Sequence, residues 1–445
     1  MARSLTDQEY RMAFTATLSP KQGIAEQERE FYVPVTEEVR GADLCQRLLD
    51  VVDLTLGDAV TLVTGPRGSG KTSELLRFGQ TLKINRKFLY TDITDYLRPS
   101  EPLDPARLLT GIVAGLVSGI AKAGRDYLDI DTRSPWNRLR RFVKRLDVTG
   151  VDASFELGAE PVKATSTVHI ALNDSPTFRD ALGKAMSQNR ANFREEMLGI
   201  VKSLTDKLAE TGRTPVLVVD SLDHFRGNSD QNSTNSYERV RTSLETVFAD
   251  FREELSLPGV HVLYSVPSYL QCSWANTRQL LNIKVLTQSG DPFEPGLAQL
   301  QAILEKRAPK DGGLARLLDG ERLQRVLINS GGMFRDLFRL ASEVVYNASS
   351  LPASDQAVYD AMTNCRRDIL GGPTGTAREQ MDLLAAIADN PDYLPRRDEL
   401  SDFEWLETLG AIVRYPDGPK GYWLSVHPLL RDVVADSRKY AQPTP

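Results

Sequence analysis

The residues whose types and spacing are most specific for chemistry lie between positions 65 and 73. They match the pattern GxxxxGK(S/T) in full and continue with one further serine: Gly65, Pro66, Arg67, Gly68, Ser69, Gly70, Lys71, Thr72 and Ser73. In this pattern glycines let backbone N–H groups turn toward phosphate oxygens, the lysine reaches the β- and γ-phosphates, and the threonine hydroxyl ligates Mg²⁺. We therefore expect residues 65–73 to bind a nucleoside triphosphate with its Mg²⁺.

Two carboxylates follow an apolar segment later in the chain. Residues 216–219 are Val-Leu-Val-Val and lead into Asp220, and Asp223 comes three positions on. An acid at the end of a buried strand holds Mg²⁺ through water in P-loop enzymes, so Thr72 and Asp220 are the expected metal residues. Many hydrolysing P-loop enzymes place a glutamate directly after this acid to activate water, whereas this chain has Ser221.

The elements that must position these residues alternate between strands and helices. Short apolar runs predict strands at 58–64, 88–91, 215–219 and 260–266, and a helix is expected at 72–82, directly after the loop. Strands separated by helices predict a parallel sheet with helices on both faces, so the expected fold class is α/β, with the sheet of a P-loop NTPase.

Four domains are expected along the chain. They are an N-terminal arm (1–30), a P-loop NTPase core (31–295) with an insertion at about 124–175, a helical lid (296–370) and a winged-helix domain (371–445). The insertion is predicted to contain a β-hairpin at 148–157 and 162–172, and a long helix at 178–209 leads back to the sheet. The winged helix is inferred from helices followed by strands at 411–415 and 422–426 around a glycine-rich turn.

Asp220-Ser-Leu-Asp223 resembles the Walker B segment of NACHT and related STAND ATPases. In those families the displaced second acid is thought to serve hydrolysis, often slowly. The resemblance implies that Asp223 is the general base of an ATPase in which Lys71 and Asp220 are also catalytic. A cap on the following turn is the alternative role for Asp223.

Two further segments resemble nucleotide sensors. Gly331 to Asp336 resembles the GxxR of sensor 2 in AAA+ and origin-recognition initiator ATPases, which implies that Arg335 reaches the nucleotide; a surface salt bridge is the alternative. STAND families usually show Gly-x-Pro near this point, and this chain has no proline there. Ser265 and Ser268 both resemble sensor 1, with a plain turn as the alternative.

The C-terminal segment Val426 to Asp432 resembles the MHD motif of NB-ARC proteins, with Pro428 where that motif has aspartate. In that family the histidine contacts the β-phosphate of bound ADP and holds the protein closed. The resemblance implies this role for His427, and a packed helix cap is the alternative.

Composition excludes several classes of protein. The chain of 445 residues has 54 basic and 60 acidic residues, which excludes a generally basic nucleic-acid coat.

Three distant cysteines without a CxxC pair exclude a disulfide framework and a zinc ribbon. An N-terminus without an apolar core favours a location in the cytoplasm. Residues 108–121 are apolar but too few to span a bilayer, so they predict a buried helix rather than a membrane segment.

The combined prediction is a slow, ATP- and ADP-dependent switch of the STAND or AAA+ type. ATP is expected because no guanine-reading motif is evident. The switch is expected to control a partner effector, by analogy one of antiviral defence, and to change its homo-oligomeric state with the nucleotide. The alternatives are a DNA-binding ATPase similar to initiator or transposition ATPases, using the basic segment 133–145, and a nucleotide-locked scaffold with little turnover.

Overall fold

The computed structural model describes residues 4–18, 30–55, 58–127, 171–227, 233–370, 376–418 and 421–441, with isolated positions between 137 and 168. The chain divides into two compact units, each treated by itself below. Unit 1 comprises Met1–Asp43, Gly65–Gly70 and Leu280–Pro445, and unit 2 comprises Leu44–Thr64 and Lys71–Gln279. Within the described ranges, no helix combines the length and the apolar character needed to cross a membrane.

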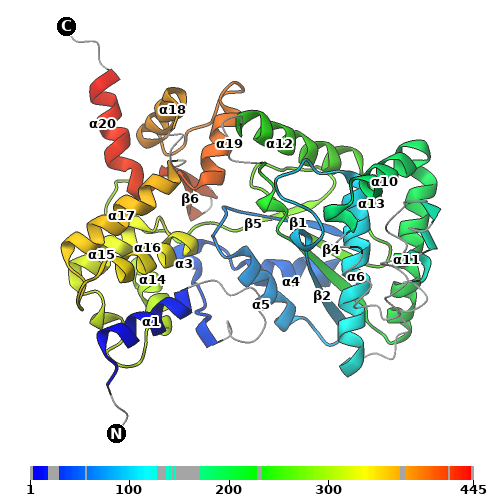
Figure 1. Ribbon diagram of the computed structural model, residues 1–445, viewed down its shortest axis with the longest axis horizontal. Helices are drawn as coiled ribbons and strands as arrows, with labels where there is room; N and C mark the ends of the chain where they lie inside the picture. Colours follow the sequence, from blue (N-terminus) through cyan, green and yellow to red (C-terminus); the bar gives the residue numbers. More distant parts are fainter. Residues whose placement is uncertain are drawn as a thin grey trace. The chain divides into compact units, whose positions relative to one another are not determined.

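Unit 2 contains a five-stranded parallel sheet with helices on both faces, which confirms the predicted α/β class (Figure 1). The order is β2-β3-β4-β1-β5, with bounds Val60–Thr64 (β1), Arg86–Asp92 (β2), Thr214–Asp220 (β3), His261–Ser265 (β4) and Asn276–Gln279 (β5). Four of these strands were predicted. The apolar runs of β1, β3 and β4 are buried, whereas β2 buries only Leu89 and Thr91. The prediction missed β5, because this polar strand lies at the sheet edge and lacks an apolar run.

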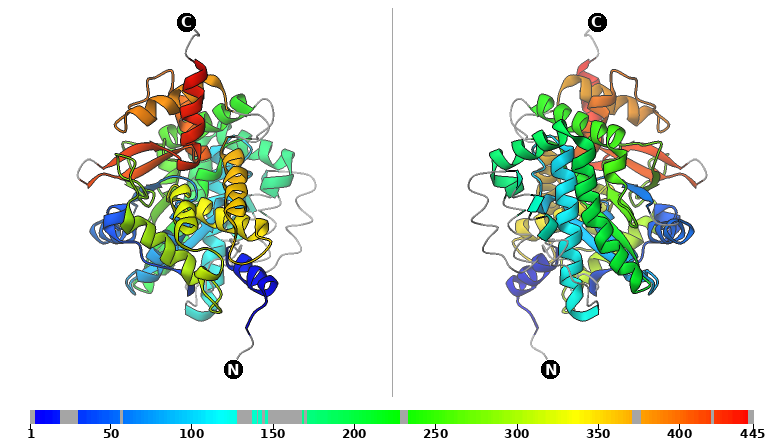
Figure 2. Two further views of the ribbon diagram at one scale, coloured as in Figure 1. Left: turned by 90° about the vertical axis from the view of Figure 1, so that its left-hand side faces the viewer. Right: turned by 90° about the vertical axis from the view of Figure 1, so that its right-hand side faces the viewer.

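The helices of unit 2 are α4 (Leu44–Leu54), α5 (Lys71–Thr81), α6 (Pro105–Tyr127), α10 (Pro176–Gln188), α11 (Arg190–Glu210), α12 (Ser233–Asp250) and α13 (Arg252–Leu255). The predicted buried segment 108–121 lies in α6, which packs against β2 and beside α11 (Figure 2). Gly115 permits the close approach of α6 to the sheet, since a Cβ there would lie 2.4 Å from the side chain of Thr91.

Two predicted elements of unit 2 are corrected. The single helix expected at 178–209 is two helices, because the Asn189 side chain accepts a hydrogen bond from the N–H of Asn192 and begins α11 anew. Residues 171 and 172, expected to end a strand, are helical. The remainder of the predicted hairpin, 148–157 and most of 162–172, lies outside the described residues.

Unit 1 is built from helices and one two-stranded antiparallel hairpin. Its helices are α1 (Asp7–Leu18), α3 (Glu37–Arg40), α14 (Glu294–Arg307), α15 (Gly320–Asn329), α16 (Phe334–Asn347), α17 (Asp355–Ile369), α18 (Arg378–Asp389), α19 (Leu400–Leu409) and α20 (Arg431–Ala441). The predicted hairpin is present as β6 (Ile412–Pro416) and β7 (Tyr422–Val426). The segments 296–370 and 376–441 share one hydrophobic core, because the turn Pro428–Leu430 packs against α15 and α17.

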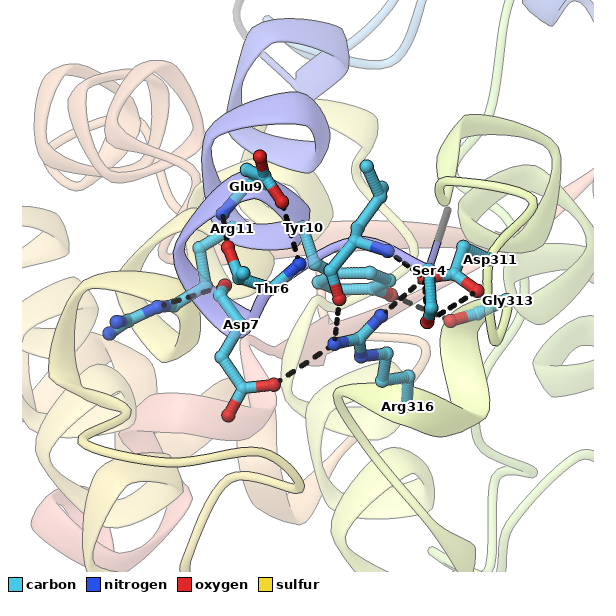
Figure 3. A network of polar contacts seen from close by, with 10 residues as sticks. Ser4, Thr6, Asp7, Glu9, Tyr10, Arg11, Asp311, Gly313 and Arg316 are labelled. Carbon is cyan, nitrogen blue, oxygen red and sulfur yellow. Dashed lines mark hydrogen bonds and ion pairs between the residues drawn. The ribbon is translucent and has the colours of Figure 1, made fainter. Parts of the chain in front are cut away.

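The expected N-terminal arm contains the helix α1. Tyr10 and Phe14 of α1 are fully buried in the core of unit 1, and the Tyr10 hydroxyl donates to the carbonyl of Gly313 at 2.6 Å. Arg316 bonds the carbonyl of Leu5 at 2.7 Å and lies 5.1 Å from the centre of the Tyr10 ring (Figure 3). The apolar stripe of α1 is short, so its helical period was not recognised.

Candidate phosphate-binding site

The loop between β1 and α5 has the backbone conformation that its glycines predict. Gly65, Gly68 and Gly70 have φ angles of 149°, 82° and 91°, which residues with a side chain rarely adopt. Space is a second constraint, because a Cβ on Gly65 would lie 2.5 Å from the carbonyl oxygen of Leu280. Since α5 begins at Lys71, the loop leads directly into a helix N-terminus, where free N–H groups favour an anion.

The loop also contains a buried hydroxyl that fits a ligand. Ser69 is 2% exposed, and its Oγ has no hydrogen-bond partner within the described part of the chain. A buried polar atom without a partner costs free energy. An oxygen-rich group such as a phosphate, seated in the loop, would supply the missing partner.

Lys71 and Asp223 meet directly in unit 2. The Lys71 Nζ lies 3.0 Å from Asp223 Oδ2, and the two side chains are only 4% and 8% exposed. Ser265, at the end of β4, donates a hydrogen bond to Asp223 Oδ1 at 3.4 Å. Of the two serines considered near this point, Ser265 is therefore the one placed beside the second acid.

A bend after β3 separates the two acids. Ser221 has φ 73° and ψ 12°, a left-handed conformation that is uncommon for a residue with a side chain and marks a constrained site. The 3₁₀ turn Leu222–His224 follows, and it contains Asp223. The bend is what the sequence could not specify, since serine has no preference for this conformation.

The two predicted metal residues are in contact. Asp220 is 1% exposed, and its Oδ2 accepts a hydrogen bond from the Thr72 hydroxyl at 2.7 Å. Its Oδ1 accepts from the N–H of Ser221 at 2.8 Å. The hydroxyl and the carboxylate both supply oxygen ligands, which Mg²⁺ prefers, and they lie close enough together to share one ion.

Tyr90 belongs to this site and was missed in the sequence. Its hydroxyl donates to the same Oδ2 of Asp220, at 2.9 Å. Burial and the negative charge of Asp220 raise the pKa of Tyr90, so the phenol stays protonated and remains a donor. No sequence pattern marked Tyr90, because its position follows from the register of β2 and β3, which pairs Asp92 with Asp220 two residues after Tyr90.

Arg335 lies against the loop within unit 1. Its N–H donates to the carbonyl of Gly68 at 3.2 Å, and its Nε lies 2.9 Å from Asp336 Oδ1. A Cβ on Gly68 would lie 2.5 Å from the Arg335 Cβ, so the contact needs glycine here. Arg335 therefore makes a salt bridge, which was considered as its alternative role, and its backbone N–H also contacts the loop.

His427 is fully buried and caps a turn. Its Nδ1 accepts a hydrogen bond from the N–H of Leu429 at 3.2 Å, which is the packed cap considered as the alternative role. Its Nε2 lies 3.6 Å from Asp336 Oδ2 and makes no hydrogen bond among the described residues. Burial, opposed by Asp336 and assisted by Arg335, lowers the pKa of His427 to about 4, so the ring is neutral near pH 7.

The basic segment 133–145 is described only in part. Arg138, Arg141 and Arg145 line one surface pocket together with Glu195 and Glu196. Arg145 is ion-paired with Glu196. The described arginines therefore lie among carboxylates rather than on a uniformly positive surface, and the other basic residues of the segment lie outside the described residues.

The described residues include no group of three or more His, Cys, Asp or Glu side chains arranged to hold a metal ion. When the sequence is compared with models of protein families and with curated proteins, neither a family nor a relative matches it.

Proposed function

We propose that this protein binds ATP and ADP with Mg²⁺ through residues 65–73 and hydrolyses ATP slowly. The observation that carries the proposal is the contact of Lys71 with Asp223, together with the contact of Thr72 with Asp220. Lys71 and Thr72 follow β1 through the loop, Asp220 is the last residue of β3, and Asp223 comes three residues later, so all four lie at the carboxyl ends of these strands. Ligands of open parallel sheets bind at this edge.

The topology of the sheet adds support. Strand β4 lies between β1, which precedes the loop, and β3, which ends in Asp220. This is the arrangement expected for a P-loop ATPase of the additional-strand type. It also places Ser265, at the end of β4, beside Asp223.

Each residue has a distinct expected role. The loop N–H groups, the Ser69 hydroxyl and the Lys71 ammonium would bind phosphate oxygens, and Thr72 and Asp220 would hold Mg²⁺. When bound, Mg²⁺ neutralises charge on the β- and γ-phosphates. Once Lys71 turns to a phosphate, Asp223 would accept a hydrogen bond from a water molecule and take its proton as general base.

The remainder of unit 1 is proposed to act as the switch. In this interpretation α14 to α17 form a helical lid, and α18, α19, the β6–β7 hairpin and α20 form a winged helix, as in STAND and AAA+ ATPases. Arg335 and His427 are the candidate nucleotide sensors. ATP and ADP would favour different conformations of the protein only if they make different contacts with these two side chains. The proposed output of the switch is control of a partner effector.

The switch is tested by the solution mass and the protease-cleavage pattern of the full chain with Mg·ADP and with a non-hydrolysable Mg·ATP analogue. We expect the two nucleotides to give different patterns, and a defined oligomer with the analogue alone would identify assembly as the output. Identical masses and identical cleavage at saturating nucleotide would contradict a nucleotide-dependent switch.

A further inference from the structure

The phosphate loop is held within unit 1 by three residues, Arg40, Phe334 and Arg335, called here the loop clamp. Arg40 donates from a terminal guanidinium nitrogen to the carbonyl of Ser69. The N–H of Arg335 donates to the carbonyl of Gly68 at 3.2 Å. The ring of Phe334 lies so close that a Cβ on Gly70 would come within 2.8 Å of it.

Arg40 is the centre of the clamp. It is only 6% exposed, and its Nε donates to the carbonyl of Leu281 at 3.0 Å, while the other end of the guanidinium bonds Ser69. The guanidinium also lies 5.2 Å from the centre of the Phe334 ring. A planar fork that bonds two carbonyls and stacks on an aromatic ring is specific to arginine.

The bond to Ser69 has a consequence for the opposite side of the same peptide. In a planar trans peptide the C=O and the N–H point in opposite directions. When Arg40 fixes the carbonyl of Ser69, it also fixes the N–H of Gly70, which points away from Arg40. Gly70 precedes Lys71 in the binding motif, so this N–H is one of those expected to meet a phosphate oxygen.

We propose that Arg40 is a positioning residue for the phosphate loop: it holds the Ser69–Gly70 peptide so that the Gly70 N–H faces a bound phosphate. The proposal rests on the proposed nucleotide binding. Arg40 was not predicted, because it lies before the loop in a short helix and belongs to none of the recognised motifs.

The chain offers a matched control for the stability effect of losing such an arginine. Arg316 is also in unit 1, bonds a backbone carbonyl at Leu5, and lies 5.1 Å from the centre of the Tyr10 ring (Figure 3). Among the described residues it contacts Leu5, Asp7, Tyr10 and Asp311, and none of these is in the loop. Arg316→Ala therefore removes a similar set of contacts without touching residues 65–70.

The experiment measures the Kd of Mg·ATP and Mg·ADP and the Tm of the full chain for wild type, Arg40→Ala, Arg40→Lys and Arg316→Ala. We expect Arg40→Ala to raise both Kd values at least tenfold and Arg40→Lys to raise them less. Arg316→Ala should lower Tm while changing Kd less than twofold.

Two results would overturn the positioning role: wild-type affinity in Arg40→Ala, or an equal loss of affinity in Arg40→Ala and Arg316→Ala. If Arg40→Ala does not fold, the affinity of Arg40→Lys is the deciding measurement. Wild-type affinity in Arg40→Lys would show that nucleotide binding does not require a guanidinium bonded to both the Leu281 and Ser69 carbonyls. Failure of the wild type to bind either nucleotide would instead contradict the proposed function.

Discussion

The Lys71 ammonium and the Asp223 carboxylate form a buried ion pair, with 3.0 Å between Nζ and Oδ2. Buried charges are costly unless they are paired, so each residue is held in place by the other. A phosphate oxygen is an equivalent partner for the lysine. If the loop binds nucleotide as proposed, the lysine exchanges one partner for the other, and the loss of each member should have a different effect: on binding for Lys71 and on turnover for Asp223.

Asp223→Asn is expected to lower the rate of ATP turnover by about 10²- to 10⁴-fold, the range of a lost general base. The Kd for Mg·ATP should stay within a few-fold of wild type, because asparagine keeps the shape and competes less strongly for Lys71. Single-turnover hydrolysis and equilibrium binding separate the two effects. Turnover equal to wild type would favour the nucleotide-locked scaffold over an ATPase.

Tyr90→Phe removes one of the two hydroxyls that donate to Asp220 Oδ2. Removing a side chain that bonds a metal-holding residue typically lowers metal affinity by about 10- to 100-fold, so we expect ATP binding to need that much more Mg²⁺. Titration of Mg²⁺ at fixed ATP measures the shift. Tyr96→Phe is the matched control, since Tyr96 is buried after the same strand; equal Mg²⁺ dependence in both variants would exclude a role for Tyr90.

Gly68→Ala should disturb the loop through space as well as through backbone conformation. The new Cβ would lie 2.5 Å from the Arg335 Cβ, at a φ of 82°. Gly421→Ala is the control, because Gly421 has a φ of 94° but no atom within 4 Å of such a Cβ. Both variants should lose about 1 kcal/mol of stability or more from strain, and only Gly68→Ala should weaken nucleotide binding. Equal affinities would show that the Gly68–Arg335 contact is not needed.

Acid should destabilise the protein through His427. Its pKa is about 4 in the folded chain, against 6.5 unfolded, so the unfolded chain binds more protons between these values. The contribution is complete above about pH 6.5 and is lost as the pH falls toward 4, by roughly 2 kcal/mol between pH 7 and pH 5. Urea unfolding of His427→Asn, whose side chain keeps an acceptor, should show a pH 5-to-7 difference smaller by this amount. An unchanged difference would mean that His427 does not titrate as its burial requires.

The sequence predicted the parts of the fold that depend on local patterns. The apolar runs gave four of the five strands, and the loop motif identified Lys71 and Thr72, whose type and spacing are their signal. Strand β5 was missed because an edge strand needs no apolar run, and α1 because its apolar stripe is short.

The rest of the site depends on contacts between residues distant in sequence. Tyr90 meets Asp220 through the register of β2 and β3, and Arg40 reaches Ser69 through tertiary packing. Neither has a spacing that could be recognised. The left-handed conformation of Ser221, which bends the chain between the two acids, is likewise set by its surroundings and not by the preference of serine.

The measurement that tests the central claim most directly is equilibrium binding of Mg·ATP to wild type, Lys71→Ala and Lys83→Ala. Lys83 is the control, because it is a mostly exposed lysine paired with Asp53 just after the same helix. We predict that the wild type and Lys83→Ala bind with equal affinity and that Lys71→Ala shows at least a hundredfold loss. Tight ATP binding by Lys71→Ala, or the absence of binding by the wild type, would contradict the account.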